Sequence, residues 1–265
     1  VLVPLISLIL AAILSALVII GIGEDPVAAF KLMVDGALMR SSGWGYTLYY
    51  ATNFIFTGLA VSVAFHARLF NIGGEGQAMI GGLGVALACL YIPWPNWYVA
   101  LLGATVSAAI FGALWALIPA YLQAKRGSHI VITTIMFNFI AAAVLNYVLV
   151  NILRPQGAMD PATARFPEAT TLPTFQDMFS TAAEPMFRGA PANVTFFLAI
   201  FMCLTVWILI WRTKLGYEIR AFGQSESAAK YAGISPVKIT VVAMLISGAL
   251  AGMMALHTTM GEAAR

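Results

Sequence analysis

The sequence predicts an all-α protein that crosses a membrane several times. Of its 265 residues, 61% are hydrophobic and only 9% are charged, and the mean hydropathy is +0.89. A soluble domain carries roughly 25% charged residues, so this chain has too few charges to cover a surface in water. Its apolar residues also fall into runs of about 20, the length of a helix that spans the bilayer. These observations disfavour large soluble enzymes, disordered chains and nucleic-acid-binding proteins.

Seven apolar runs predict seven spanning helices in a single domain over 1–265, a polytopic transmembrane bundle. The first run has no charged residue, and polar or proline-containing segments separate the others. Residues 26–39 fit a short amphipathic helix lying at the membrane interface. The spans are expected near 1–20, 48–65, 78–92, 98–122, 130–152, 193–211 and 239–256.

Two polar segments set the expected orientation. Residues 153–191 contain six prolines and predict a long loop outside the membrane, whereas 212–238 are short and rich in charge. When the loops are assigned alternately, one side carries eight basic residues in short segments, and the other carries five in two long loops with seven acidic residues. The positive-inside rule makes the first side cytoplasmic. The amino terminus and 212–238 are then cytoplasmic, and 153–191 is external.

A glycine-rich stretch, 71–77, predicts that the third span begins as a broken helix. Three glycines in four positions hold a regular helix poorly. Glu75 lies among them and places a carboxylate in or beside the membrane, where it needs a partner, water or a helix amino terminus. Transporters use broken helices to present polar groups to a solute cavity. The alternative is a cytoplasmic loop in which Glu75 is solvated.

Polar residues also share one face of the fifth span. Thr134, Asn138 and Asn146 are spaced i, i+4 and i+12 on an otherwise apolar helix. An asparagine inside a span must find hydrogen bonds on another helix or on a solute. Packing between helices and contact with solute therefore both remain open.

The segment 212–238 has the pattern of a short docking helix. Ser225 is a candidate helix cap, 226–231 fit one or two helical turns, and Gly233 is a candidate stop. Small residues on such a helix, Ala228 and Ala229, suit a groove on another protein. The alternative is a plain linker between two spans.

Other motifs give weaker signals. The chain has no Gly-x-x-x-x-Gly-Lys-Ser/Thr loop, so it does not bind ATP by that device. Ser247 and His257 suggest an intramembrane protease dyad, but ten residues on one helix place them about 15 Å apart along its axis. Small residues in the fourth and seventh spans favour close packing within one chain over a dedicated dimer face. These small residues are Ala104, Ala108, Gly112, Gly248 and Gly252.

Four stretches, taken in order along the chain, resemble the membrane permeases of bacterial ABC importers. The resemblance is to the branch with ribose and other simple-sugar permeases and, within it, to nucleoside-type permeases. The block at 226–233 departs from the fullest form of the family's coupling motif. The resemblance therefore implies docking to an ATPase more firmly than it implies the contact of any single residue. The four stretches are 70–77, 132–138, 226–235 and 244–252.

The resemblance implies a permease subunit, without enzymatic activity of its own, that forms the pathway for a nucleoside or simple sugar in a bacterial inner membrane. It implies three partners: a second permease subunit, an ABC ATPase that holds ATP and magnesium, and an extracytoplasmic solute-binding protein. Family permeases are longer, so we expect this chain to lack the last few helices. The expected pathway residues are Asn71, Glu75, Gln77, Thr134 and Asn138, and the expected coupling residues are Gly223, Glu226, Ala228, Ala229 and Gly233.

Two other functions remain open from the residues alone. An ion- or proton-coupled secondary transporter would use Glu75 as its ion site. An intramembrane enzyme would depend on Ser247 or His257.

Overall fold

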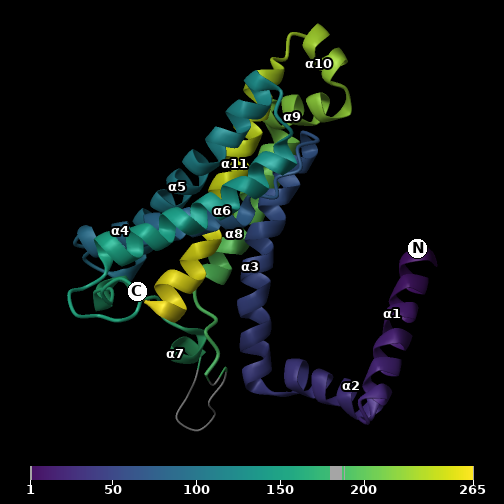
Figure 1. Ribbon diagram of the computed structural model, residues 1–265, viewed down its shortest axis with the longest axis vertical. Helices are drawn as coiled ribbons and strands as arrows, with labels where there is room; N and C mark the ends of the chain where they lie inside the picture. Colours follow the sequence, from purple (N-terminus) through teal and green to yellow (C-terminus); the bar gives the residue numbers. More distant parts are fainter. Residues whose placement is uncertain (1, 180–186, 188, 265) are drawn as a thin grey trace.

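The computed structural model describes residues 2–179, 187 and 189–264, and this part of the chain is a helical bundle (Figure 1). Within it, six helices are long and apolar enough to cross a bilayer. They confirm the all-α fold and the positions of six of the expected spans. The six are α1 (Leu2–Gly21), α3 (Ser41–His66), α5 (Trp97–Arg126), α6 with the π-helical turn η2 (Ile130–Leu153), α8 (Thr195–Arg212), and α11 (Pro236–Leu256) with the π-helical turn η4 (His257–Ala263).

The remaining expected span forms α4 (Gly74–Tyr91), which is not among the six. Its first turn carries Glu75 and Gln77, and these polar residues lower the hydropathy of an 18-residue helix. Most of α4 is buried against other helices. Because protein rather than lipid surrounds it, α4 can afford a polar start that a lipid-facing helix could not.

Helix α11 is the centre of the bundle and packs against α5, α4 and α3. The contact depends on small residues: a Cβ on Gly252 would overlap the Ala108 carbonyl oxygen, and a Cβ on Gly81 would overlap the Gly252 backbone. Ala104, Ala108 and Ala116 are fully buried on the α5 side of this contact. The small-residue faces are therefore used for packing within the chain, as the sequence favoured, because close approach of helix backbones needs them.

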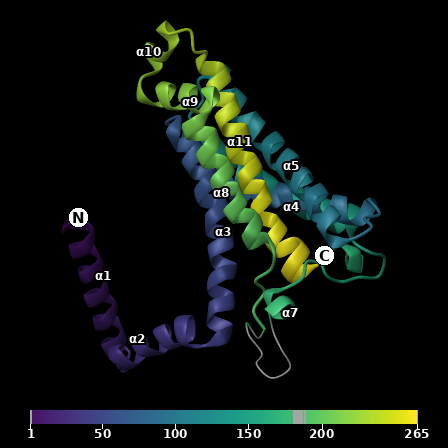
Figure 2. The ribbon, with the colours of Figure 1, turned by 180° about the vertical axis from the view of Figure 1, so that it is seen from behind.

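The amino-terminal helices stand apart from the bundle (Figures 1 and 2). Helix α1 has no buried residue and leads into α2 (Pro26–Val34) and the π-helical turn η1 (Asp35–Met39). The Asp25 side chain caps α2 by accepting a hydrogen bond from Val27 N at 2.9 Å. This confirms a short helix over the expected interfacial segment.

The proline-rich segment 153–191 is a packed cap rather than an open loop, at the end of the bundle that holds the carboxyl terminus (Figure 1). It contains η3 (Glu168–Thr170) and α7 (Phe175–Phe179), and Phe166, Leu172 and Phe175 are buried. A backbone hydrogen bond joins it to η4, from Leu172 N to Met260 O at 3.2 Å. Residues 180–186 and 188 of this predicted loop lie outside the described residues.

Helices α9 (Lys214–Gln224) and α10 (Glu226–Tyr231) project from the opposite end of the bundle (Figure 1). Glu218 on α9 approaches Lys214 at 3.9 Å and Lys238 of α11 at 3.8 Å. Arg220 donates to Ile210 O at 3.1 Å and stacks over Trp211. These contacts hold α9 against the ends of α8 and α11, and α9 in turn fixes the position of α10.

Candidate functional site

The chain between α3 and α4 turns back into the bundle instead of staying at its end. Asn71 in this segment donates from Nδ2 to Ser247 Oγ at 2.8 Å, and Ser247 Oγ donates to Ala60 O at 2.7 Å. Ser247 lies 11 residues into α11, roughly 16 Å along the helix at 1.5 Å per residue. The start of α4 therefore lies deep in the bundle. The predicted break is limited to the residues before Gly74, because Gly74 and Gly76 lie within the regular helix α4.

Asn71 and Gln77 form a buried pair that closes the turn. Asn71 Nδ2 donates to Gln77 Oε1 at 2.9 Å, and Gln77 Nε2 donates back to Asn71 Oδ1 at 3.1 Å. Asn71 Oδ1 also accepts from Gly73 N at 2.9 Å. Both side chains are almost fully buried. Since these bonds occupy all the donors and acceptors of Asn71, its contribution here is to hold the irregular backbone.

Helix α6 supplies a second clamp on the same turn. Asn138 Oδ1 accepts from Gly76 N at 2.9 Å, and its Nδ2 donates to Ile72 O at 3.0 Å. The first amide groups of a helix have no partner within the helix, so Asn138 satisfies one of them from a neighbouring helix. Thr134 is fully buried beside Gly73, and its hydroxyl donates to Ile130 O at 2.8 Å. Packing between helices is thus the observed use of Thr134 and Asn138.

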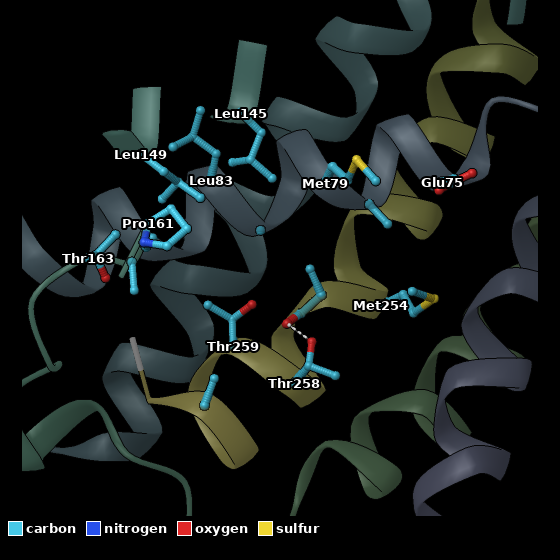
Figure 3. Close-up of a pocket in the computed structure, with 16 residues that line it drawn as sticks. Glu75, Met79, Leu83, Leu145, Leu149, Pro161, Thr163, Met254, Thr258 and Thr259 are labelled. Carbon is cyan, nitrogen blue, oxygen red and sulfur yellow. Dashed lines mark hydrogen bonds between the residues drawn. The ribbon is translucent and has the colours of Figure 1, made fainter. Parts of the chain in front are cut away.

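Glu75 is the one expected pathway residue that lines the larger cavity (Figure 3). This cavity has a volume of about 480 Å³ and lies between α4, α6 and the α11–η4 helix, with 161–163 of the cap at one end. Most of its wall is apolar, with Met79, Leu83 and Met254 prominent. The Glu75 side chain is exposed, and no hydrogen bond or ion pair is found for it among the described residues. Asn71, Gln77, Thr134 and Asn138 lie behind this wall and do not line the cavity.

The predicted coupling segment has the expected helix signals. Ser225 caps α10 by accepting from Ala228 N at 3.3 Å, and Gly233 has a φ of +83°. Glu226, Ala228 and Gly233 are exposed at the tip. The two other expected coupling residues are buried. Ala229 lies on the buried face of α10, and Gly223 lies so close to the end of α3 that a Cβ would overlap the His66 carbonyl oxygen.

A smaller cavity of about 280 Å³ lies beneath α10. Arg68 from the end of α3 lines it, together with Gln123 near the end of α5, Glu226 of α10 and Pro236 of α11. Arg68 and Glu226 therefore face one small cavity below the tip, where the ends of α3, α5 and α11 come together.

Residues 44–263 of this chain match the family model described as the branched-chain amino acid transport system permease component. That match covers both the start of α4 and the coupling segment. The chain belongs to this permease family.

Individual relatives agree with the family match. The permease is 33% identical to the guanosine ABC transporter permease protein NupP of Bacillus subtilis, over 95% of this chain and 70% of that protein. It is 30% identical to the nucleoside ABC transporter permease protein NupB of Lactococcus lactis, over 96% of this chain and 69% of that protein. It is also 30% identical to the glucose ABC transporter permease protein TsgB13 of Haloferax volcanii, over 94% of this chain and 65% of that protein. No solved structure matches it. The chain is therefore a multi-pass permease subunit of the ABC transporter class.

Sequence reasoning missed the cavity residues of the permease on η4. Thr258 and Thr259 lie just beyond 239–256, where the last span is expected to end. In the structure the helix continues through the π-helical turn η4, which brings both threonines to the cavity. A pair of threonines after an apolar run carries no signal for this, because only the neighbouring α4 and α6 define the cavity.

Ser247 and His257 of the permease belong to separate networks. Ser247 bonds to Asn71 and Ala60. His257 Nδ1 lies 2.6 Å from Thr195 Oγ1 and 3.2 Å from Asn193 Oδ1, and its ring stacks on Tyr49. This second network joins α3, α8 and η4 under the cap. Neither residue bonds to the other within the described structure, so the geometry gives no support to a protease dyad.

Proposed function

We propose that this permease forms the pathway of an ABC importer for a small, neutral, polar solute, either a nucleoside or a simple sugar. Nucleosides and sugars carry no charge, so their pathway needs hydrogen-bonding groups more than net charge. Relatives named for guanosine, nucleoside and glucose transport support this solute class. The cavity supports it through a few polar side chains in an otherwise mainly apolar wall, those of Glu75, Thr163, Thr258 and Thr259.

The coupling part of the proposal rests on helices α9 and α10, which are held in place against the ends of α8 and α11. Its tip exposes Glu226, Ala228 and the ring of Tyr231, which is 97% exposed. An exposed aromatic residue on a short rigid helix suits a groove on a partner. We assign this groove to an ATPase subunit, where ATP and magnesium would bind. Buried Gly223 and Ala229 then act by supporting the tip rather than by touching the ATPase.

Two further partners complete the proposed importer. A second permease subunit, identical or different, completes the pathway. An extracytoplasmic solute-binding protein delivers solute to the end that carries 153–191. The α9–α10 end and the amino terminus face the cytoplasm of a bacterial cell. ATPase closure would act on α11 through its contacts with α9, and so change which packing of the bundle is favoured.

For the pathway we assign different roles to the five expected residues. Glu75 faces the cavity and is open to solute. Asn71, Gln77 and Asn138 act as positioning residues, because their hydrogen bonds hold the turn that presents Glu75. Thr134 acts through packing against Gly73.

The test is uptake by the full importer in proteoliposomes, with ATP inside or absent and with a protonophore added. An ABC importer should need ATP and keep its uptake in the presence of the protonophore. Uptake that needs no ATP and stops with the protonophore would favour the ion-coupled transporter in which Glu75 is the ion site.

A further inference from the structure

The larger cavity contains polar groups with unused hydrogen-bonding capacity. We propose that it is a nucleoside-binding site, with the base beside Glu75, Met79 and Met254 and the ribose beside Thr258 and Thr259. This inference rests on the proposed importer function and narrows its solute to one class. Figure 3 shows the arrangement: Glu75 lies at one end, Met79 and Met254 come next to it, and the threonines lie further along.

The size and lining of the cavity fit a small organic solute. Its volume of about 480 Å³ lies within the range of roughly 300–1,000 Å³ that is usual for ligand sites. Such sites are mainly apolar with a few convergent polar groups. Here α4, α6 with η2, α11 with η4, and the cap all contribute lining residues.

The polar groups can both accept and donate. The carboxylate of Glu75 accepts hydrogen bonds and has no partner among the described residues. Thr258 Oγ1 donates to Ala255 O at 3.2 Å, which leaves its oxygen free to accept. No hydrogen bond is found for the Thr259 hydroxyl within the described structure, so it can donate or accept.

These groups are divided between two ends, as the polar groups of a nucleoside are. A guanine base offers two neighbouring N–H donors on one edge, and a carboxylate can accept both. Its flat faces are apolar, and methionine sulfur makes favourable contacts with aromatic rings. The ribose hydroxyls are gathered at the other end of the molecule, where the threonines lie.

A free hexose fits this cavity less well. Its hydroxyls surround the whole ring, and each one that loses water without a new partner costs free energy. The walls formed by Leu83, Met79 and Met254 offer no such partner. The cavity should therefore select a nucleoside over a monosaccharide.

The experiment measures uptake of radiolabelled guanosine and of radiolabelled ribose and glucose by the full importer. We expect ATP-dependent uptake of guanosine and little uptake of either sugar. Thr259→Val should lower guanosine uptake about 2- to 10-fold, the effect of one lost hydrogen bond. Glu75→Gln should be milder than Glu75→Leu, because the amide still accepts. Leu83→Trp, which fills the cavity, should reduce uptake to background.

Matched controls lie on exposed faces of the bundle. Thr205→Val on α8 and Leu102→Trp on α5 make the same changes at exposed positions and should transport normally at equal membrane levels. If the wild type imports guanosine and the cavity variants match it, the site assignment is wrong while the importer function stands. If the wild type imports ribose or glucose and not guanosine, the nucleoside assignment is wrong. Uptake of no solute with ATP would overturn the importer function and this inference together.

A second readout separates a solute site from a pocket filled by lipid. In a background with Cys89 and Cys203 replaced by alanine, Met79→Cys should react with a charged thiol reagent, and millimolar guanosine should slow the reaction. Leu102→Cys on the exposed face of α5 should not react. An unreactive Met79→Cys would show that apolar material fills the cavity and would overturn the proposal.

Discussion

Asn138 and Asn146 are two asparagines on one helix with different surroundings. Asn138 of α6 forms hydrogen bonds with Gly76 N, in the first turn of α4, and with Ile72 O, just before α4. Asn146 is exposed and has no hydrogen bond among the described residues. An asparagine inside a span is thus not by itself a sign of a solute site, because its partner decides its role.

We predict that Asn138→Leu lowers both the thermal stability and the uptake of the permease, whereas Asn146→Leu changes neither. Leucine would leave the part-buried Gly76 amide without its partner, and an unpaired buried group costs about 1–3 kcal/mol. The Ile72 carbonyl is exposed and would lose less. Unfolding in detergent and uptake at matched expression measure the two effects. A normal melting temperature for Asn138→Leu would show that the clamp contributes nothing to stability.

At the scale of elements, the contact of α11 with α4 and α5 depends on glycine. We predict that Gly252→Ala destabilises the bundle by about 1–3 kcal/mol, the usual cost of overpacking. The new Cβ would overlap the Ala108 carbonyl oxygen, and a backbone atom has little freedom to move away. Gly58→Ala on α3 is the control, because nothing lies within 4 Å of its Cβ position. Equal melting temperatures for the two variants would contradict the prediction.

The end of α10 offers a test of coupling. Gly233 has a φ of +83°, a conformation that a β-branched residue resists. We predict that Gly233→Val weakens ATPase association or solute-stimulated hydrolysis while the permease still inserts into the membrane. Ala232→Val, one residue earlier at an ordinary φ of −77° and equally exposed, should be neutral. Co-purification and ATPase assays of the assembled importer measure both, and full coupling in Gly233→Val would return the segment to the role of a linker.

At the scale of the whole molecule, the two ends of the bundle differ in charge and structure. One carries the basic helix ends and α9–α10, and the other carries the packed cap (Figures 1 and 2). We predict that a cysteine at Met159, which is 96% exposed, reacts with an impermeant reagent outside intact cells, and that one at Ser227 does not. Thr170 is unsuitable as the outer probe because it is buried and bonded to Pro167 O. Labelling in the reverse pattern would invert the orientation and remove the basis for ATPase docking.

The elements of this permease could be predicted from sequence because their signals are local. The spans follow from hydropathy, and α10 follows from its Ser225 cap and the Gly233 stop. The likeness of 71–77 and 226–235 to ABC permeases is also local, and the family match bears it out. The third expected span, α4, has a weaker hydropathy signal, since α4 is polar at its start and is enclosed by other helices.

The sequence by itself determined that this is a helical membrane permease and where its helices lie. Only the tertiary structure decided what the polar residues do, because their partners are far away in the chain. Asn71 bonds to Ser247 at a separation of 176 residues, and Gly76 bonds to Asn138 at a separation of 62. The cavity is likewise a product of packing, since Glu75 and Thr259 meet it only where α4 lies beside η4. Local patterns specify helices, whereas the pairing of buried polar groups is settled when the helices come together.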